Sequence, residues 1–120
     1  MEFSVSLKKN HEFRRLYEKG RSATTPLLVV YFRRTNREYN QVGITVGTKI
    51  GNAVCRNRIR RQIREIYRLN ESKLQKGLDI VIVARMRSRY VSYAELEKAY
   101  LFACSRLGIL SGMPENGEKQ

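Results

Sequence analysis

The chain has 120 residues, which suffices for one domain with a single modest hydrophobic core and not for a second domain. Its 24 lysines and arginines outnumber its 11 acids, so the formal net charge is +13, the isoelectric point lies near 10.3, and the expected partner is a polyanion. The hydrophobic fraction of 42% excludes a disordered chain, and no apolar run approaches the roughly 20 residues that span a bilayer.

The first seven residues are too few and too weakly apolar for a secretory signal, so we expect the protein to remain in the cytoplasm. Residues 10–19 are predicted to form a short helix, with Asn10 as its N-cap and Gly20 just beyond its end. The apolar face of this helix consists of Phe13, Leu16 and Tyr17. Core packing is the simplest role for such a face.

Two strands are predicted next. Residues 27–32 are rich in β-branched and aromatic side chains and too few for a buried helix, so we expect a strand covered on both faces for much of its length. Residues 42–46 alternate apolar and small residues, and could pair antiparallel with the first strand across the polar turn between them. Tyr31 shares a face with Leu27 and Val29, where a core position is the ordinary assignment.

The segment 49–68 concentrates positive charge on a predicted helix that is capped by Asn52. An apolar stripe at steps of four and three is formed by Cys55, Ile59, Ile63 and Ile66. Against the single acid Glu65, the segment has seven basic residues: Lys49, Arg56, Arg58, Arg60, Arg61, Arg64 and Arg68. Guanidinium groups can bind a phosphate through two parallel hydrogen bonds, and solvated helix faces normally mix acids with bases. The pattern therefore favours an RNA- or DNA-binding face.

Residues 78–84 form the strongest predicted strand. The loop after it could form a lesser anion site with three arginines, Arg85, Arg87 and Arg89. Residues 92–95 match a capping box, so a last helix is predicted from there to Gly108. We expect a single RNA-binding domain at residues 1–110 and a flexible tail at residues 111–120.

No metal or catalytic centre is predicted in the chain. Cys55 and Cys104 are expected to be buried free thiols, because they are the only cysteines, lie far apart and belong to apolar patterns. His11 has no cysteine or histidine at the spacing of metal ligands. The sequence thus predicts neither a zinc site nor a nucleophile triad.

Residues 50–65 contain the most specific signal in the chain. They are Ile-Gly-Asn-Ala-Val-Cys-Arg-Asn-Arg-Ile-Arg-Arg-Gln-Ile-Arg-Glu. This string resembles the signature of the protein subunit of bacterial ribonuclease P, which is Gly-x-Ala-Val-x-Arg-Asn-Arg followed by further basic residues. The resemblance extends from about Leu7 to Leu110 in length, element order and basic character.

The predicted order of helix, strand, strand, helix, strand and helix indicates an α+β fold, a single two-layer sandwich with one small mixed sheet. The strands at 42–46 and 78–84 flank the basic helix and could form a parallel β-α-β crossover, which general rules make right-handed in about 98% of cases. The resemblance instead implies the left-handed βαβ crossover of the ribonuclease P protein family, a fold shared with a ribosomal protein domain.

The resemblance also implies a function, that of the protein component of an endoribonuclease that removes the 5′ leader from precursor tRNA. In this family the catalytic RNA subunit and its magnesium ions hydrolyse the phosphodiester bond, while the protein binds the leader and stabilises the RNA. The implied partners are the ribonuclease P RNA and precursor tRNA. The resemblance implies neither a membrane nor DNA as a partner. It also implies no metal or cofactor bound tightly by the protein itself.

Two groups of binding residues follow from the resemblance. The basic helix is implied to contact the catalytic RNA through Lys49, Arg56, Asn57, Arg58, Arg60, Arg61, Arg64 and Arg68. A cleft for the single-stranded leader is implied at Phe13, Tyr17 and Tyr31, bordered by Asn57 and Arg61. Thr48 departs from the family pattern, which often has a second basic residue there, and Tyr17 replaces a frequent Phe while keeping an aromatic ring for stacking.

Three other functions are compatible with parts of the sequence. A structural RNA-binding protein of ribosomal type would need the arginines without an aromatic cleft. An autonomous nuclease would cut precursor tRNA without an RNA subunit. A DNA-binding helix is disfavoured, because the basic helix lies between two strands and lacks the adjacent helix of a helix-turn-helix.

Overall fold

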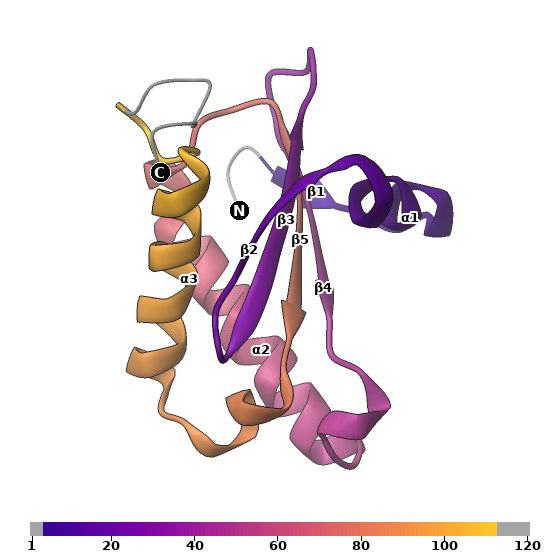
Figure 1. Cartoon of the computed structure of the whole chain (residues 1–120), viewed down its shortest axis with the longest axis vertical. Coiled ribbons are helices and arrows are strands. Elements are labelled where there is room, and N and C mark those ends of the chain that lie inside the picture. Colours follow the sequence, from indigo (N-terminus) through magenta and orange to yellow (C-terminus); the bar gives the residue numbers. More distant parts are fainter. Residues whose placement is uncertain (1–3, 113–120) are drawn as a thin grey trace.

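The computed structural model describes residues 4–112. Its strands are β1 (Ser4–Ser6), β2 (Arg21–Thr24), β3 (Leu28–Arg34), β4 (Asn40–Thr45) and β5 (Leu78–Ala84). Its α-helices are α1 (Asn10–Lys19), α2 (Ala53–Asn70) and α3 (Tyr93–Leu107). One open sheet contains all five strands, with α1 against one face and α2 and α3 against the other (Figure 1). The predicted α+β class is confirmed.

Strand β5 forms the centre of the sheet, whose order is β1-β4-β5-β3-β2. It pairs parallel with β4 and antiparallel with β3, so the predicted parallel crossover through the basic helix is confirmed. The predicted antiparallel pairing of residues 27–32 with residues 42–46 is wrong, because β5 lies between β3 and β4. A strand that is apolar on both faces is best shielded from water at the centre of a sheet.

The two faces of the sheet contribute to two cores of unequal size. The larger core joins the sheet to α2 and α3 and includes Leu28, Val30, Phe32, Ile80, Ile82, Ile59, Ile63, Leu96 and Tyr100. The smaller core, under α1, consists of Leu7, Leu16 and Val81, with Phe13, Tyr31 and Val83 packed against it. One face of β3 is fully buried and the other is half-buried, with Tyr31 packed against the core under α1, so the predicted cover on both faces is complete on one face and partial on the other.

Strands β1 and β2 were not predicted. β1 has three residues, Ser-Val-Ser, and β2 has four, Arg-Ser-Ala-Thr. Their side chains are mostly exposed, so neither sequence shows the apolar pattern by which strands are predicted. Both are edge strands: β1 extends the sheet parallel to β4, and β2 pairs antiparallel with β3. The element order accordingly has two more strands than the sequence indicated.

Most of the predicted helix ends are confirmed. The Asn52 side chain accepts a hydrogen bond from the Cys55 backbone N–H at 2.9 Å, Ser92 and Glu95 form both halves of a capping box, and Gly108 ends α3 in the left-handed region with φ 72°. Asn10 is not a cap. It is the first residue of α1, and Lys9 precedes it without a side-chain cap.

The end of the described chain is attached to the body of the protein. The Ser111 backbone N–H donates to the Lys73 carbonyl at 2.6 Å, and its hydroxyl donates to the Leu74 carbonyl at 3.1 Å. Of the predicted tail at residues 111–120, positions 113–120 lie outside the described residues. Within residues 4–112, no helix has the length and apolar character needed to cross a membrane.

Candidate RNA-binding site

Helix α2 packs on the sheet through isoleucines and turns arginines outward. Ile59, Ile63 and Ile66 are at most 1% exposed, and burial of each such side chain contributes roughly 1.5–3 kcal/mol. The exposed polar residues of the helix include Asn57, Arg58, Arg61, Arg64 and Arg68, whereas Arg56 and Arg60 are half-buried. Docking by the apolar stripe therefore leaves a dense positive face available for an anionic partner.

Four residues of this face surround a hollow of about 240 Å³ and are called the arginine group below: Asn57, Arg60, Arg61 and Arg64. Within the group, Arg60 Nη1 donates to Asn57 Oδ1 at 2.9 Å, which orients that guanidinium. Within the part of the chain that the structure describes, Arg61 and Arg64 have no hydrogen bond or ion pair with another side chain. Both can thus bind a phosphate without first breaking an internal contact.

The other arginines of α2 have intramolecular partners. Arg56 Nη1 donates to the Gly51 carbonyl at 2.8 Å and so fixes the turn that precedes the helix. Arg58 Nη2 lies 3.5 Å from the Arg89 carbonyl oxygen. Arg68 forms a two-pronged ion pair with Glu65, at 3.0 and 2.6 Å, and these hydrogen bonds lower the pKa of the Glu65 carboxyl. The sequence predicted one uniform binding face, but the structure divides it into unpaired and paired arginines.

Lys49 lies apart from the arginine group, in the 3₁₀ helix Thr48–Ile50. It lines a hollow of about 970 Å³ at one end of the sheet, together with Thr45, Arg85 and Arg87. Two of the three loop arginines donate hydrogen bonds to backbone carbonyls. Arg85 Nη1 donates to the Thr25 carbonyl oxygen and Arg89 Nη1 to that of Ile50, each at 2.9 Å. Of the three arginines of the predicted lesser anion site, Arg87 is the one with no hydrogen bond to a backbone carbonyl among the described residues, and the anion site itself stays a prediction.

The three aromatic residues implied by the resemblance lie together and are called the aromatic cleft below. Phe13 and Tyr17 on α1 have ring centroids 6.5 Å apart, and Tyr17 meets Tyr31 of β3 edge to face at 5.0 Å. The Tyr17 ring is 42% exposed, and its hydroxyl lies 3.2 Å from Thr45 Oγ1. The rings present both an apolar surface and polar groups to an occupant, which suits unpaired bases.

Gly43 of β4 makes room for the Phe13 ring of the aromatic cleft. A Cβ atom at this position would lie 2.6 Å from Cζ of Phe13, closer than any side chain tolerates. Gly43 and Tyr31 both pair with Val81 of β5, from opposite sides, so these three residues lie in one row across three strands. Sequence analysis did not select Gly43, although an isolated glycine within a strand pattern indicates a close approach of another group.

The aromatic cleft and the arginine group meet around β4. A hollow of about 170 Å³ is lined by Phe13 and Gly43 and also by Arg60 and Arg64 of α2. The helices α1 and α2 lie on opposite faces of the sheet, and β1 pairs only with residues 40–42 of β4. Among the described residues, the short edge strand thus leaves residues 43–45 of β4 unpaired on this side, beside both the Phe13 ring and the arginines of α2.

The buried carboxylate of the central strand is already engaged. Asp79 of β5 is 4% exposed and forms ion pairs with Arg37 and with Arg33 Nε, the latter at 3.4 Å. Among residues 4–112, no group of three or more His, Cys, Asp or Glu side chains could hold a metal ion. Cys55 is half-buried, Cys104 is buried, and both are free thiols.

Comparison with known proteins agrees with this geometry. A family model described as Ribonuclease P matches residues 1–108. The chain belongs to the ribonuclease P protein family. The ribonuclease P protein component of Alkaliphilus metalliredigens is 42% identical over 111 residues, covering 92% of this chain and 100% of that protein. The component from Clostridioides difficile is 42% identical over 94 residues, covering 78% of this chain and 82% of that protein.

Solved structures of ribonuclease P proteins have the same fold. The protein from Staphylococcus aureus has a TM-score of 0.81 at 30% identity, covering 88% of this chain and 97% of that one. The protein from Thermotoga maritima has a TM-score of 0.75 at 31% identity, covering 81% and 92%. Members of the family are protein components of ribonuclease P, the ribonucleoprotein that processes the 5′ end of tRNA, so membership implies partnership with the ribonuclease P RNA.

Proposed function

We propose that this chain binds the ribonuclease P RNA through the arginine group of α2 and the 5′ leader of precursor tRNA through the aromatic cleft. The division follows the chemistry of the two surfaces. Arginines bind phosphates of any sequence, whereas aromatic rings stack on unpaired bases, at about 1–3 kcal/mol per base. Base-paired regions of RNA offer no free base face, so the leader is the part of the substrate that suits the cleft.

One observation carries this proposal: Phe13 of the aromatic cleft and Arg60 and Arg64 of the arginine group line the same hollow. A leader strand in the cleft would therefore lie directly beside the RNA subunit on α2. A structural RNA-binding protein of ribosomal type would need the arginines alone. The exposed ring of Tyr17, packed edge to face on the half-buried ring of Tyr31, favours the leader-binding function over that alternative.

In this proposal the magnesium ions belong to the RNA subunit, and they supply the activated water and the stabilisation of negative charge. The protein contributes affinity for the substrate and for the folded RNA. Asp79, held by two arginines, takes no part in metal binding.

Cleavage assays with separated components test the proposal. Precursor tRNA is incubated with the protein alone, with a bacterial ribonuclease P RNA alone, and with both, over a range of magnesium concentrations. We expect no cleavage by the protein alone, and cleavage by the reconstituted complex at magnesium concentrations too low for the RNA alone. Specific 5′ cleavage by RNA-free protein would instead identify an autonomous nuclease.

A further inference from the structure

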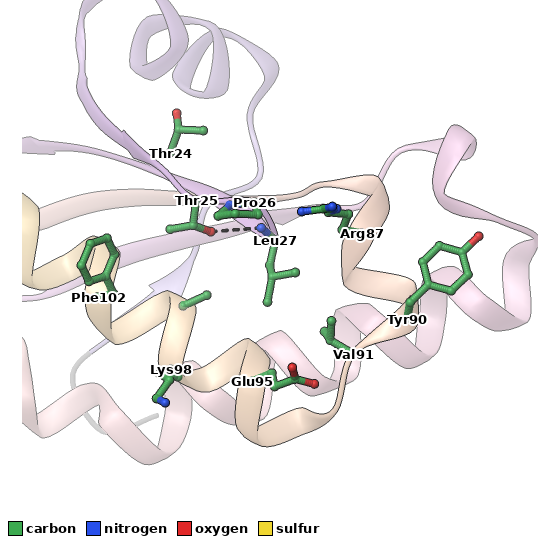
Figure 2. Close-up of a pocket in the computed structure, with 11 residues that line it drawn as sticks. Thr24, Thr25, Pro26, Leu27, Arg87, Tyr90, Val91, Glu95, Lys98 and Phe102 are labelled. Atoms are coloured by element: carbon green, nitrogen blue, oxygen red, sulfur yellow. Dashed lines mark hydrogen bonds between the residues drawn. The ribbon is translucent and has the colours of Figure 1, made fainter.

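A separate hollow of about 710 Å³ lies between the β2–β3 turn, the 3₁₀ helix Met86–Tyr90 and α3. It is called the α3 hollow below. Figure 2 shows Leu27 in its middle, with Phe102 on one side and Tyr90 and Val91 on the other. Neither the arginine group nor the aromatic cleft contributes a residue to it. Its size falls within the range of small-ligand sites, and its lining is mostly apolar.

Two aromatic rings flank the α3 hollow and are unusually accessible. Tyr90 is 76% exposed and Phe102 is 54% exposed. Each ring has a guanidinium over it: that of Arg89 lies 5.2 Å from the Tyr90 centroid, and that of Arg106 lies 5.8 Å from the Phe102 centroid. Exposed rings associated with arginines are typical of surfaces on which nucleic acid bases stack.

The charged residues around the α3 hollow favour an anionic occupant. Arg87 and Lys98 line it and are exposed. The acid in the lining is Glu95, whose carboxylate accepts a hydrogen bond from the Ser92 backbone N–H at 3.0 Å as part of the helix cap. Since the whole chain has a net charge of +13, a second copy would be repelled, whereas a nucleotide offers both a flat apolar base and a phosphate.

The α3 hollow is continuous with the region of the aromatic cleft. Thr24, Thr25, Pro26 and Arg87 line both the α3 hollow and the 970 Å³ hollow at the end of the sheet. That second hollow also includes Thr45, whose hydroxyl contacts Tyr17 in the aromatic cleft. A single strand leaving the cleft near Thr45 would therefore pass over the β2–β3 turn, which the two hollows share, to reach Phe102 and Tyr90.

We propose that the α3 hollow is a distal subsite for an unpaired nucleotide of long 5′ leaders, beyond the nucleotides that the aromatic cleft holds. The base stacks on Phe102 or Tyr90, and Arg87 and Lys98 bind the neighbouring phosphates. This inference rests on the proposed leader-binding function and adds a second place of contact. Short leaders do not reach the subsite, so its contribution depends on leader length.

The test measures the affinity of the reconstituted holoenzyme for precursor tRNAs with leaders of increasing length. Wild-type affinity should rise again once the leader extends beyond the cleft. The double variant Phe102→Ala/Tyr90→Ala should abolish that second rise, a loss of about five-fold or more for long leaders, while leaving affinity for short leaders unchanged, and the single variant that removes the stacking ring should account for most of that loss. Leu69→Ala is the matched control, because Leu69 is 52% exposed on α2 and does not line the hollow.

A photo-crosslink from a 4-thiouridine near the 5′ end of a long leader tests the same contact in the wild-type protein. We expect crosslinks within residues 86–102, and crosslinks confined to other segments would overturn the subsite. The subsite is also wrong if Phe102→Ala and Tyr90→Ala have the wild-type affinity at every leader length while Tyr31→Ala weakens leader binding. If Tyr31→Ala also has no effect, the proposed leader-binding function itself fails. A self-association of the free protein that Phe102→Ala abolishes would assign the hollow to a second copy and overturn the proposal.

Discussion

Tyr31 lies where the small core and the aromatic cleft meet. Its ring packs against the core formed by Leu7, Leu16 and Val81, and it also meets Tyr17 edge to face. Part of its side chain is therefore structural, and part is available to a ligand. A substitution at this residue must be examined for both effects, because the loss of a half-buried ring lowers stability as well.

We expect Tyr31→Ala to lower the affinity of the holoenzyme for precursor tRNA by about five-fold or more, since a stacked base contributes 1–3 kcal/mol. Mature tRNA has no leader, so its affinity should remain nearly unchanged, and so should the affinity of the protein for the RNA subunit. The measurement is the ratio of the affinities for precursor and mature tRNA, wild type against variant. Tyr31→Phe, which keeps the ring, serves as the control and should preserve the ratio.

An unchanged ratio in folded Tyr31→Ala would limit Tyr31 to the core. Circular dichroism and thermal melting establish whether the variant is folded. Should Tyr31→Ala unfold, Tyr17→Ala tests the same cleft, because Tyr17 is 42% exposed and its removal disturbs packing less.

At the residue level, sequence analysis could name the cleft aromatics only through the resemblance to a family. Helical spacing places Phe13 and Tyr17 on one face of α1. Nothing in the sequence requires their contact with Tyr31, which arises because α1 packs against β3 and β5. Gly43 and the backbone-binding role of Arg56 depend on the folded geometry, since their partners lie elsewhere in three dimensions. Local patterns specify which side chains can bind, and the tertiary fold decides which of them remain unpaired.

At the level of elements, α2 combines two kinds of arginine on one helix. Arg61 and Arg64 are exposed members of the arginine group. Arg68 is neutralised by Glu65, and Arg56 binds the Gly51 carbonyl. Substitutions along one helix should therefore have different effects, although all remove the same charge.

Arg61→Ala and Arg64→Ala should each weaken binding to the ribonuclease P RNA, and each should reduce the steepness of its salt dependence by about one, because each removes one phosphate contact. Arg68→Ala should change the slope less, since Glu65 already offsets its charge. The measurement is log Kd against log salt concentration for each variant.

Arg56→Ala should act mainly on stability, lowering the free energy of unfolding by about 1 kcal/mol through loss of its hydrogen bond to Gly51. Urea unfolding of all four variants provides this comparison. The proposed binding role of the arginine group would be wrong if all four variants had the same salt dependence of RNA binding and Arg61→Ala and Arg64→Ala had a lower free energy of unfolding. These arginines would then act in stability.

The elements differed in how well the sequence predicted them. The strand at 78–84 was predicted with its observed bounds, because a run that is apolar at every position but Asp79 is typical of a strand buried on both faces. The N-caps of α2 and α3 follow from side-chain chemistry within four residues and were also predicted. The short edge strands β1 and β2 and the insertion of β5 between β3 and β4 depend on pairing between distant segments, which local patterns do not encode.

For the molecule as a whole, positive charge covers the surface while polar groups that can ionise are buried in the large core. Burial raises the pKa of the Cys104 thiol to about 12 and raises the pKa of the Tyr100 hydroxyl. Burial also raises the pKa of Tyr67, whose hydroxyl lies 2.6 Å from Ser4 Oγ and so links α2 to β1. All three groups remain neutral in the folded protein at physiological pH.

These pKa shifts predict that the protein loses stability at high pH. A thiol whose pKa is about 12 in the folded state and near 9 in the unfolded state contributes its full stabilisation below about pH 9, and loses it progressively as the pH rises toward 12. The unfolded chain binds fewer protons in that interval, so the free energy of unfolding falls, by at most about 1.4 kcal/mol per pH unit for each such group. Urea unfolding between pH 8 and 11 should show this fall. Cys104→Ala should make the slope shallower than in wild type and in the control Cys55→Ala, whereas equal slopes in all three proteins would mean that the Cys104 thiol ionises as easily in the fold as outside it.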